Sequence, residues 1–148
     1  MNPRTTEPTT AAEIRAVIDA FLDAVRAQDL ARIGSYYASE VRAFDAVNRL
    51  EFRGREAYLK HWADCLAVCP GPSVFDLDHL EIEAGGDLAV SHGLLHCGGV
   101  DETGEEKTAW MRVTVTYRKV GGRWQIVHEH YSMPFDMKTG QMLCGLTP

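Results

Sequence analysis

The chain has 148 residues, a net charge of −6 and an apolar fraction of 45%, values typical of a single soluble globular domain. This acidic balance argues against a general nucleic-acid binder, which needs a basic face to meet phosphates. No apolar stretch approaches the roughly 20 residues that cross a bilayer, and the four scattered cysteines indicate free thiols. We therefore expect a cytoplasmic protein that has neither a membrane nor a nucleic-acid partner.

The first half of the chain is predicted to be mainly helical. Residues 1–10 are polar and contain two prolines, which indicates a loose tail. Thr9 or Thr10 can then cap a helix, and Glu13 follows Thr10 at the spacing of a capping box. Apolar residues at helical spacing and the capping residue Asp29 predict helices over residues 11–27, 30–37 and 55–68.

Strands are predicted once between the helices and four times after them. β-branched and aromatic runs, separated by glycine-containing turns, indicate strands over residues 40–47, 74–84, 87–98, 110–117 and 124–132. Helices followed by an antiparallel meander define an α+β arrangement, with the helices on one face of the sheet. A strongly curved sheet of this kind leaves an apolar concavity, which is a common ligand site.

Three phrases carry a resemblance to a known family. They are the opening helix, the run YYASEVRAFD followed by FRGREAY, and the closing GGRWQIVHEHYS. The chain resembles the nuclear transport factor 2-like superfamily, and within it the SnoaL-like and ketosteroid isomerase-like proteins. The resemblance implies a cone-shaped fold with three N-terminal helices on a curved antiparallel sheet. It covers residues 11–132 and leaves residues 133–148 as a C-terminal extension.

Asp45 is the strongest candidate for chemistry. It is the only charge in an apolar row that it shares with Val41, Ala43 and Val47, and such a carboxylate is paired, protonated or chemically employed. The resemblance places Asp45 at the position of the general base of ketosteroid isomerases, nine residues before Gly54. The alternative is a structural ion pair with an arginine, for which the candidates are Arg42, Arg49 and Arg112.

The same resemblance leaves two other family positions without their usual residues. The oxyanion-binding tyrosine of the family falls at Phe21, and its second donor, a protonated aspartate, falls at Val113 or Thr114. A phenyl ring cannot donate to an enolate oxygen, and neither Val113 nor Thr114 is an acid. Losing one oxyanion donor costs roughly 10²–10³ in rate. We therefore predict that the protein is not a ketosteroid isomerase.

The resemblance also implies which residues line the cone. His92 falls at a pocket position, as a second acid/base or as a hydrogen-bonded histidine with no catalytic role. The other expected lining residues are Phe21, Tyr37, Trp62, Met111, Val113, Val127, Glu129 and Tyr131. The predicted function is an isomerase or lyase in which Asp45 removes a proton from a small apolar or carbonyl-bearing molecule. The alternative is a non-catalytic ligand-binding or assembly module, and no cofactor motif is present.

The opposite face of the closing strands is predicted to pair two subunits. Aromatic and arginine side chains on an exposed sheet mark an interface better than bare solvent. The expected homodimer residues are Trp110, Arg112, Trp124, His128 and His130. The two histidines project on one side and could begin a metal site, but the sequence offers no clear third ligand, so no metal is predicted.

Overall fold

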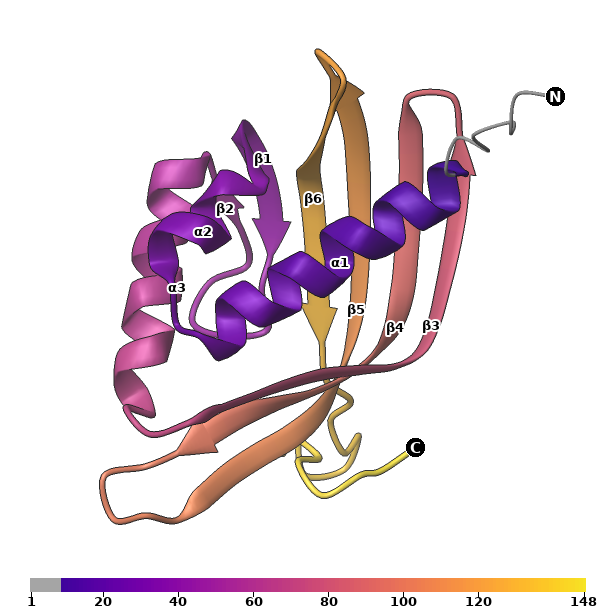
Figure 1. Cartoon of the computed structure of the whole chain (residues 1–148). Coiled ribbons are helices and arrows are strands. Elements are labelled where there is room, and N and C mark those ends of the chain that lie inside the picture. Colours follow the sequence, from indigo (N-terminus) through magenta and orange to yellow (C-terminus); the bar gives the residue numbers. More distant parts are fainter. Residues whose placement is uncertain (1–8) are drawn as a thin grey trace, which may run out of the picture.

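The computed structural model describes residues 9–148, which form three helices and a six-stranded sheet (Figure 1). The elements are α1 (Thr10–Arg26), α2 (Leu30–Ser35), β1 (Tyr37–Phe44), β2 (Phe52–Arg53), α3 (Arg55–Val68), β3 (Ser73–Gly85), β4 (Leu88–Val100), β5 (Glu106–Val120) and β6 (Arg123–Ser132). The loose tail expected at the N-terminus lies outside the described residues, except for its last two positions. No helix within residues 9–148 is long and apolar enough to cross a membrane.

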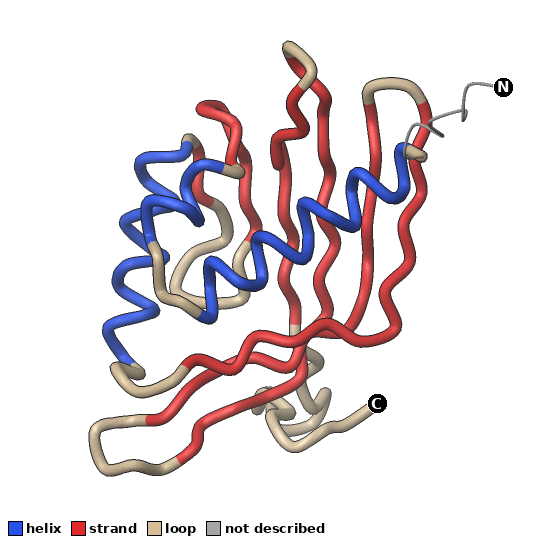
Figure 2. Tube along the Cα trace, viewed as in Figure 1, coloured by secondary structure: helices blue, strands red, loops and turns tan. Residues whose placement is uncertain are grey.

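The sheet is curved and open, and the helices cover its concave face. Its strand order is β2-β1-β6-β5-β4-β3, and every neighbouring pair is antiparallel except β1 with β6. Figures 1 and 2 show α1 crossing this face diagonally, while α2 and α3 lie over its β1 end. The predicted α+β cone of three helices on a curved antiparallel sheet is confirmed.

The start of α1 differs from the predicted capping box. Thr9 is the N-cap, and its hydroxyl accepts from the backbone N–H of Ala12 at 3.2 Å. Glu13 does not close the box. Its carboxylate accepts from the indole N–H of Trp124 at 2.7 Å and lies 3.4 Å from the Lys119 amine. The interaction therefore ties the first turn of α1 to the β5–β6 hairpin.

A β-bulge in β6 decides which of its side chains face the helices. Tyr117 pairs with Ile126 but Thr116 pairs with His128, so Val127 is an extra residue without a partner on β5. Strict alternation would place Trp124 and Glu129 on opposite faces, whereas the bulge turns both of them inward, and both are buried. The prediction that Glu129 and Tyr131 face inward therefore agrees with the structure, whereas the prediction that Trp124 faces outward is wrong.

A bend in the outer strands forms the wide end of the cone. The first half of β3, the second half of β4 and the first half of β5 turn away from the rest of the sheet and pass beneath α3 (Figure 1). Gly98 lies on this part of β4 with φ +145°, and a Cβ built there would lie only 1.9 Å from the carbonyl oxygen of Lys107. Only glycine allows the two backbones to approach so closely.

The C-terminal extension folds on itself below the sheet. Phe135 and Met142 form an isolated antiparallel bridge, and the Asp136 carboxylate accepts from the backbone N–H groups of Lys138 and Thr139 at 2.9 and 2.8 Å. Phe135 and Met142 are nevertheless exposed, as is Met137. No residue of this segment lines either of the two cavities described below.

Candidate functional site

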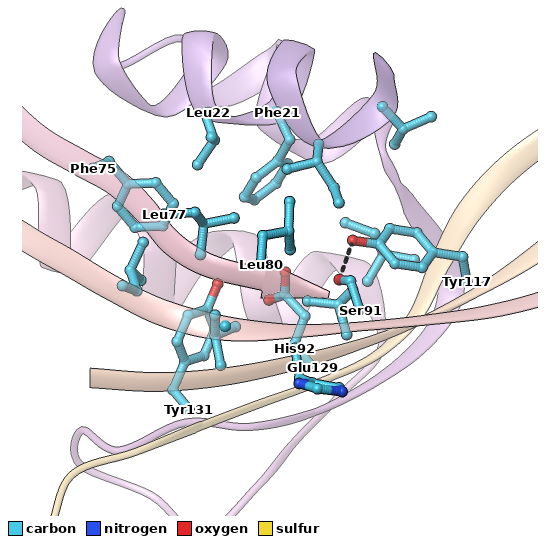
Figure 3. A pocket seen from close by; sticks show the side chains of 17 residues that line it. Phe21, Leu22, Phe75, Leu77, Leu80, Ser91, His92, Tyr117, Glu129 and Tyr131 are labelled. Atoms are coloured by element: carbon cyan, nitrogen blue, oxygen red, sulfur yellow. Dashed lines mark hydrogen bonds between the residues drawn. The ribbon is translucent and has the colours of Figure 1, made fainter. Parts of the chain in front are cut away.

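Two cavities of different size lie between the helices and the sheet in the part of the chain that the structure describes, and the larger has room for a small ligand. The first lies between α1 and the sheet (Figure 3) and has a volume of about 30 Å³, the space of a water molecule or two. The second has a volume of about 270 Å³ and lies between α3 and the bent halves of β3, β4 and β5. Its wall is mostly apolar, and Asp45 and His61 are its ionisable members apart from thiols and Tyr131.

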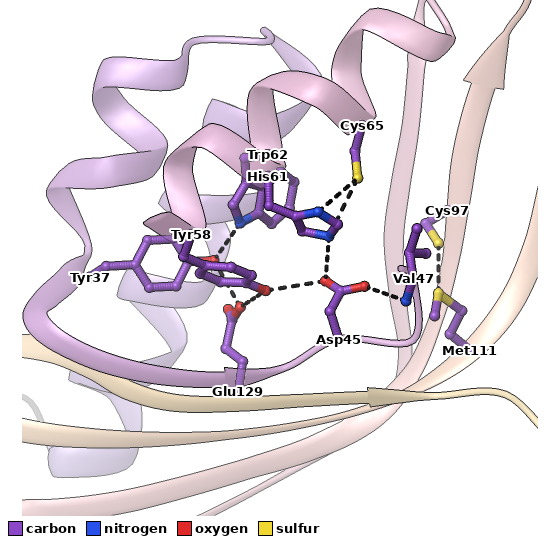
Figure 4. Close-up of polar contacts among 10 residues, drawn as sticks. All are labelled: Tyr37, Asp45, Val47, Tyr58, His61, Trp62, Cys65, Cys97, Met111 and Glu129. Atoms are coloured by element: carbon purple, nitrogen blue, oxygen red, sulfur yellow. Dashed lines mark hydrogen bonds and ion pairs between the residues drawn. The ribbon is translucent and has the colours of Figure 1, made fainter. Parts of the chain in front are cut away.

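Asp45 lies at the wall of the larger cavity, just after β1 ends. Its Oδ1 accepts from the backbone N–H of Val47 at 3.0 Å, which fixes the carboxylate. Its Oδ2 lies 3.4 Å from His61 Nε2 and 3.4 Å from the Tyr58 hydroxyl (Figure 4). Among residues 9–148 no arginine forms an ion pair with Asp45, and its side chain is 15% exposed. The partners of Asp45 are therefore His61, Tyr58 and a backbone N–H, and not the arginine of the structural alternative.

His61 is the residue that sequence reasoning missed. It projects from α3, is only 5% exposed, and stacks on the Phe52 ring with centroids 4.2 Å apart. The signal was present, because Tyr58, His61 and Cys65 recur at helical spacing on one face. The apolar spacing that predicts this helix does not include His61, so the pattern alone gives no reason to single it out. The separation of 3.4 Å from Asp45 exceeds an ideal hydrogen bond, and such contacts shorten when a substrate binds.

Glu129 is a buried carboxyl next to this pair. It is 1% exposed, and its Oε2 accepts from the Tyr37 hydroxyl at 2.8 Å and from the Tyr58 hydroxyl at 2.9 Å. Burial raises the pKa of Glu129 to about 7, although the tyrosine hydroxyls oppose the shift by stabilising the anion. The prediction that Glu129 faces inward is confirmed.

Tyr131 supplies a hydroxyl at the wall of both cavities. The residue is buried, and its hydroxyl faces the Glu129 carboxyl, which it helps to stabilise as an anion. Burial keeps the pKa of Tyr131 well above its usual value, so the hydroxyl stays protonated at neutral pH. A protonated phenol at the cavity wall can donate to an oxygen of a bound molecule.

The two thiols nearest the site are not activated nucleophiles. Cys65 Sγ lies 3.5 Å from His61 Nε2, the same nitrogen that faces Asp45, so the three side chains do not line up as a triad. Burial raises the pKa of Cys65 and that of Cys97 to about 11. Both thiols therefore stay protonated and serve as apolar lining.

The predicted pocket residues fall into three groups: those that border the small cavity, those that border the large cavity, and those that border neither. Phe21, Val113, Glu129 and Tyr131 border the small cavity, and Trp62, Met111 and Asp45 border the large one, with Tyr131 common to both. Tyr37 lies behind the wall, where it binds Glu129 and accepts from the Trp62 indole at 3.0 Å. Val127 borders neither cavity, so its assignment to the pocket is wrong. The β6 bulge moves it out of register.

The expectation that the His92 side chain enters the pocket is also wrong. His92 pairs with Thr114 on the outer face, whereas its neighbour Ser91 pairs with the inward Val115. His92 borders the small cavity between Ser91 and Gly93 (Figure 3). Its imidazole is 46% exposed and lies 3.5 Å from the Glu81 carboxylate. The histidine that lies beside Asp45 is His61 of α3.

Four of the five predicted interface residues lie on the outer face of the sheet. Trp110 stacks on His96 with ring centroids 4.9 Å apart. Arg112 donates to the Ser132 hydroxyl at 3.0 Å, and His128 and His130 both pack on Phe44. Trp124 does not belong to this set, because the bulge turns it inward toward Glu13. Within residues 9–148 no three histidine, cysteine or acidic side chains are grouped to hold a metal ion.

The comparison with protein families identifies the class. The model of the SnoaL-like domain matches residues 14–136, so the chain belongs to the SnoaL-like family. A nuclear transport factor 2-like protein of unknown function from Pseudomonas putida KT2440 is 45% identical to it. The match covers 93% of this chain and 96% of that one, with a TM-score of 0.86.

More distant solved structures share the fold. A candidate calcium/calmodulin-dependent protein kinase II association domain from Xanthomonas campestris is 21% identical, with coverage of 86% and 90% and a TM-score of 0.76. A candidate dehydratase of the nuclear transport factor 2-like family from Streptomyces avermitilis is 18% identical, with coverage of 82% and 94% and a TM-score of 0.71. No curated protein matches the chain.

Proposed function

We propose that this SnoaL-like protein binds a small apolar, carbonyl-bearing molecule and moves a proton on it, as a cofactor-independent isomerase or lyase. The observation that carries the proposal is the Asp45–His61 pair, 3.4 Å apart at the wall of an apolar cavity of about 270 Å³. An ionisable pair at the edge of an apolar cavity is the usual signature of acid–base chemistry on a small molecule.

Each polar group at the cavity has a distinct role in this reaction. Asp45 accepts a proton from the carbon next to the carbonyl group. His61 lies against the same carboxylate oxygen and can pass that proton to another atom of the substrate or to water. The Tyr131 hydroxyl donates to the carbonyl oxygen, where negative charge develops. This assignment keeps Asp45 as the base and replaces His92 with His61.

The missing oxyanion donors of ketosteroid isomerases remain missing. Phe21 and Val113 line the small cavity and carry no polar group. A single hydroxyl, that of Tyr131, takes their place from a different strand. We therefore keep the prediction that ketosteroids are not isomerised at an enzyme-like rate, which a spectrophotometric assay with a Δ5-3-ketosteroid tests directly.

Ligand binding can be tested by filling the larger cavity. A panel of small cyclic and aromatic ketones is screened by ligand-observed NMR against the wild-type protein and against Leu66→Trp, which places an indole in the cavity. Leu88→Trp is the matched control, because Leu88 is exposed at the β3–β4 turn. We expect binding to wild type and to the control and at least tenfold weaker binding to Leu66→Trp. Equal binding to all three would place the ligand elsewhere.

A second function, assembly, is supported by the outer face of the sheet. Trp110, Arg112, His128 and His130 present aromatic and cationic surface there, as interfaces do. We propose that two copies of the chain pair through this face as a homodimer. Assembly and chemistry do not compete for residues, because none of these four residues lines the larger cavity.

A further inference from the structure

A continuous chain of polar contacts connects the buried Glu129 to the candidate base. Glu129 Oε2 and the Tyr58 hydroxyl are 2.9 Å apart, and that same hydroxyl lies 3.4 Å from Asp45 Oδ2, which in turn faces His61 (Figure 4). One phenol thus separates two carboxyl groups. The proposed function explains Asp45 and His61 but does not use Glu129, although burying a carboxyl is costly.

The two tyrosine hydroxyls that contact Glu129 have one proton each to donate. The Tyr37 hydroxyl accepts from the Trp62 indole N–H at 3.0 Å, so its own proton is directed to Glu129 in every state. Tyr58 has no comparable donor that fixes its orientation among the described residues, and it carries only one proton. That proton can make a close hydrogen bond to Glu129 or to Asp45, but not to both at once.

No cation compensates Glu129. Among residues 9–148, none forms an ion pair with it, and the ionisable groups that face it are phenols and a carboxylate. They are Tyr37 of β1, Tyr58 of α3, Tyr117 of β5, Tyr131 of β6 and Asp45. An anion in this setting is held only by hydroxyl donors, so it competes with Asp45 for the Tyr58 proton. The pKa of Glu129, about 7, places this competition in the neutral range.

We propose that Glu129 is a positioning residue whose protonation state controls the candidate base Asp45 through the Tyr58 hydroxyl. When Glu129 is ionised, Tyr58 donates to it, and Asp45 faces a phenol lone pair and a second negative charge. When Glu129 takes a proton from solvent, its own O–H can donate to the Tyr58 oxygen, and the Tyr58 proton turns to Asp45. The switch moves one proton from water to Glu129 and reorients one hydroxyl group, with no other bond changed.

The inference rests on the proposed function for its purpose, but its test needs no substrate. Protein labelled with ¹³C at the aspartate and glutamate carboxyl carbons is titrated by NMR from pH 4 to pH 9. In wild type, the Asp45 signal should show a second inflection near pH 7, at the same pH as the Glu129 signal. Glu129→Gln should remove this inflection, and Tyr58→Phe should reduce its amplitude at least twofold.

Two controls separate the switch from a merely structural role. Glu81→Gln removes a carboxylate on the outer face, beside His92, and should leave the Asp45 curve unchanged. An Asp45 signal without an inflection near pH 7 in the wild type would overturn the proposal, and so would an inflection that persists in Glu129→Gln. The wild-type titration decides the question even where a variant folds poorly. A protein that shows the coupling but never exchanges a ligand proton would refute the proposed function and not this inference.

Discussion

The buried Glu129 should make the fold less stable as the pH rises through neutrality. Burial raises the pKa of Glu129 to about 7 in the folded protein, from a reference value of 4.5. Between these two values the folded chain holds more protons than the unfolded chain, so the free energy of unfolding falls with increasing pH. At about 1.4 kcal/mol for each pH unit, the loss amounts to about 3 kcal/mol and is complete above pH 7.

The prediction is tested by urea unfolding of the wild type and of Glu129→Gln at pH 5, 6, 7 and 8. The glutamine keeps the carbonyl oxygen that accepts from Tyr37 and Tyr58 but cannot ionise. Relative to the wild type, Glu129→Gln should therefore gain about 2.5 kcal/mol between pH 5 and pH 8, because the part of the titration below pH 5 lies outside the measured range. The difference between the curves is the quantity to read, because it cancels the contributions of all the titrating groups that the two proteins share.

The matched control is Glu83→Gln, a change at an exposed carboxylate on β3. Its stability should follow that of the wild type at each pH. If the curves of Glu129→Gln and the wild type ran parallel from pH 5 to pH 8, Glu129 would not titrate in this window. The reasoning from its burial would then be refuted.

Three further predictions concern the scaffold. Gly98→Ala should cost about 1–3 kcal/mol in urea unfolding, because a Cβ there would collide with the Lys107 carbonyl oxygen; an unchanged midpoint would mean that the bend does not need glycine. Glu13→Ala should lower the urea midpoint more than Glu83→Ala does, because it removes the acceptor of the buried Trp124 indole; equal midpoints would contradict this. Arg112→Glu should convert a dimer to a monomer of 16.5 kDa in light scattering at micromolar concentration, and a monomeric wild type would contradict the assembly proposal.

The element order was predictable because it depends on local patterns. Helical periodicity identified α1 and α3, and the glycine turn at 121–122 identified the β5–β6 hairpin, whose two glycines both have positive φ. The short strand β2 was missed, since two residues between a loop and a helix carry no periodic signal. The family resemblance supplied what local patterns do not: the curvature of the sheet and the cone.

The site was predictable only in part, because side-chain direction depends on register. Asp45, Glu129 and Tyr131 were placed correctly, but one extra residue in β6 reversed the assignments of Trp124 and Val127. His92 was assigned to the wrong face of β4, and the helix residue His61 was overlooked. A bulge depends on how two neighbouring strands pair. The composition and the periodicity of one strand alone therefore do not predict it.

The central claim is that Asp45, with His61 beside it, removes a proton from a ligand in the larger cavity. The most direct measurement is hydrogen–deuterium exchange next to the carbonyl group of a bound ketone in D₂O, followed by NMR with wild type, Asp45→Asn and the outer-face control His92→Gln. We expect exchange with the wild type and the control, and a rate lower by roughly 10²–10⁴ with Asp45→Asn. Equal rates for the wild type and Asp45→Asn would contradict the account, and so would a ligand that binds in the cavity and never exchanges.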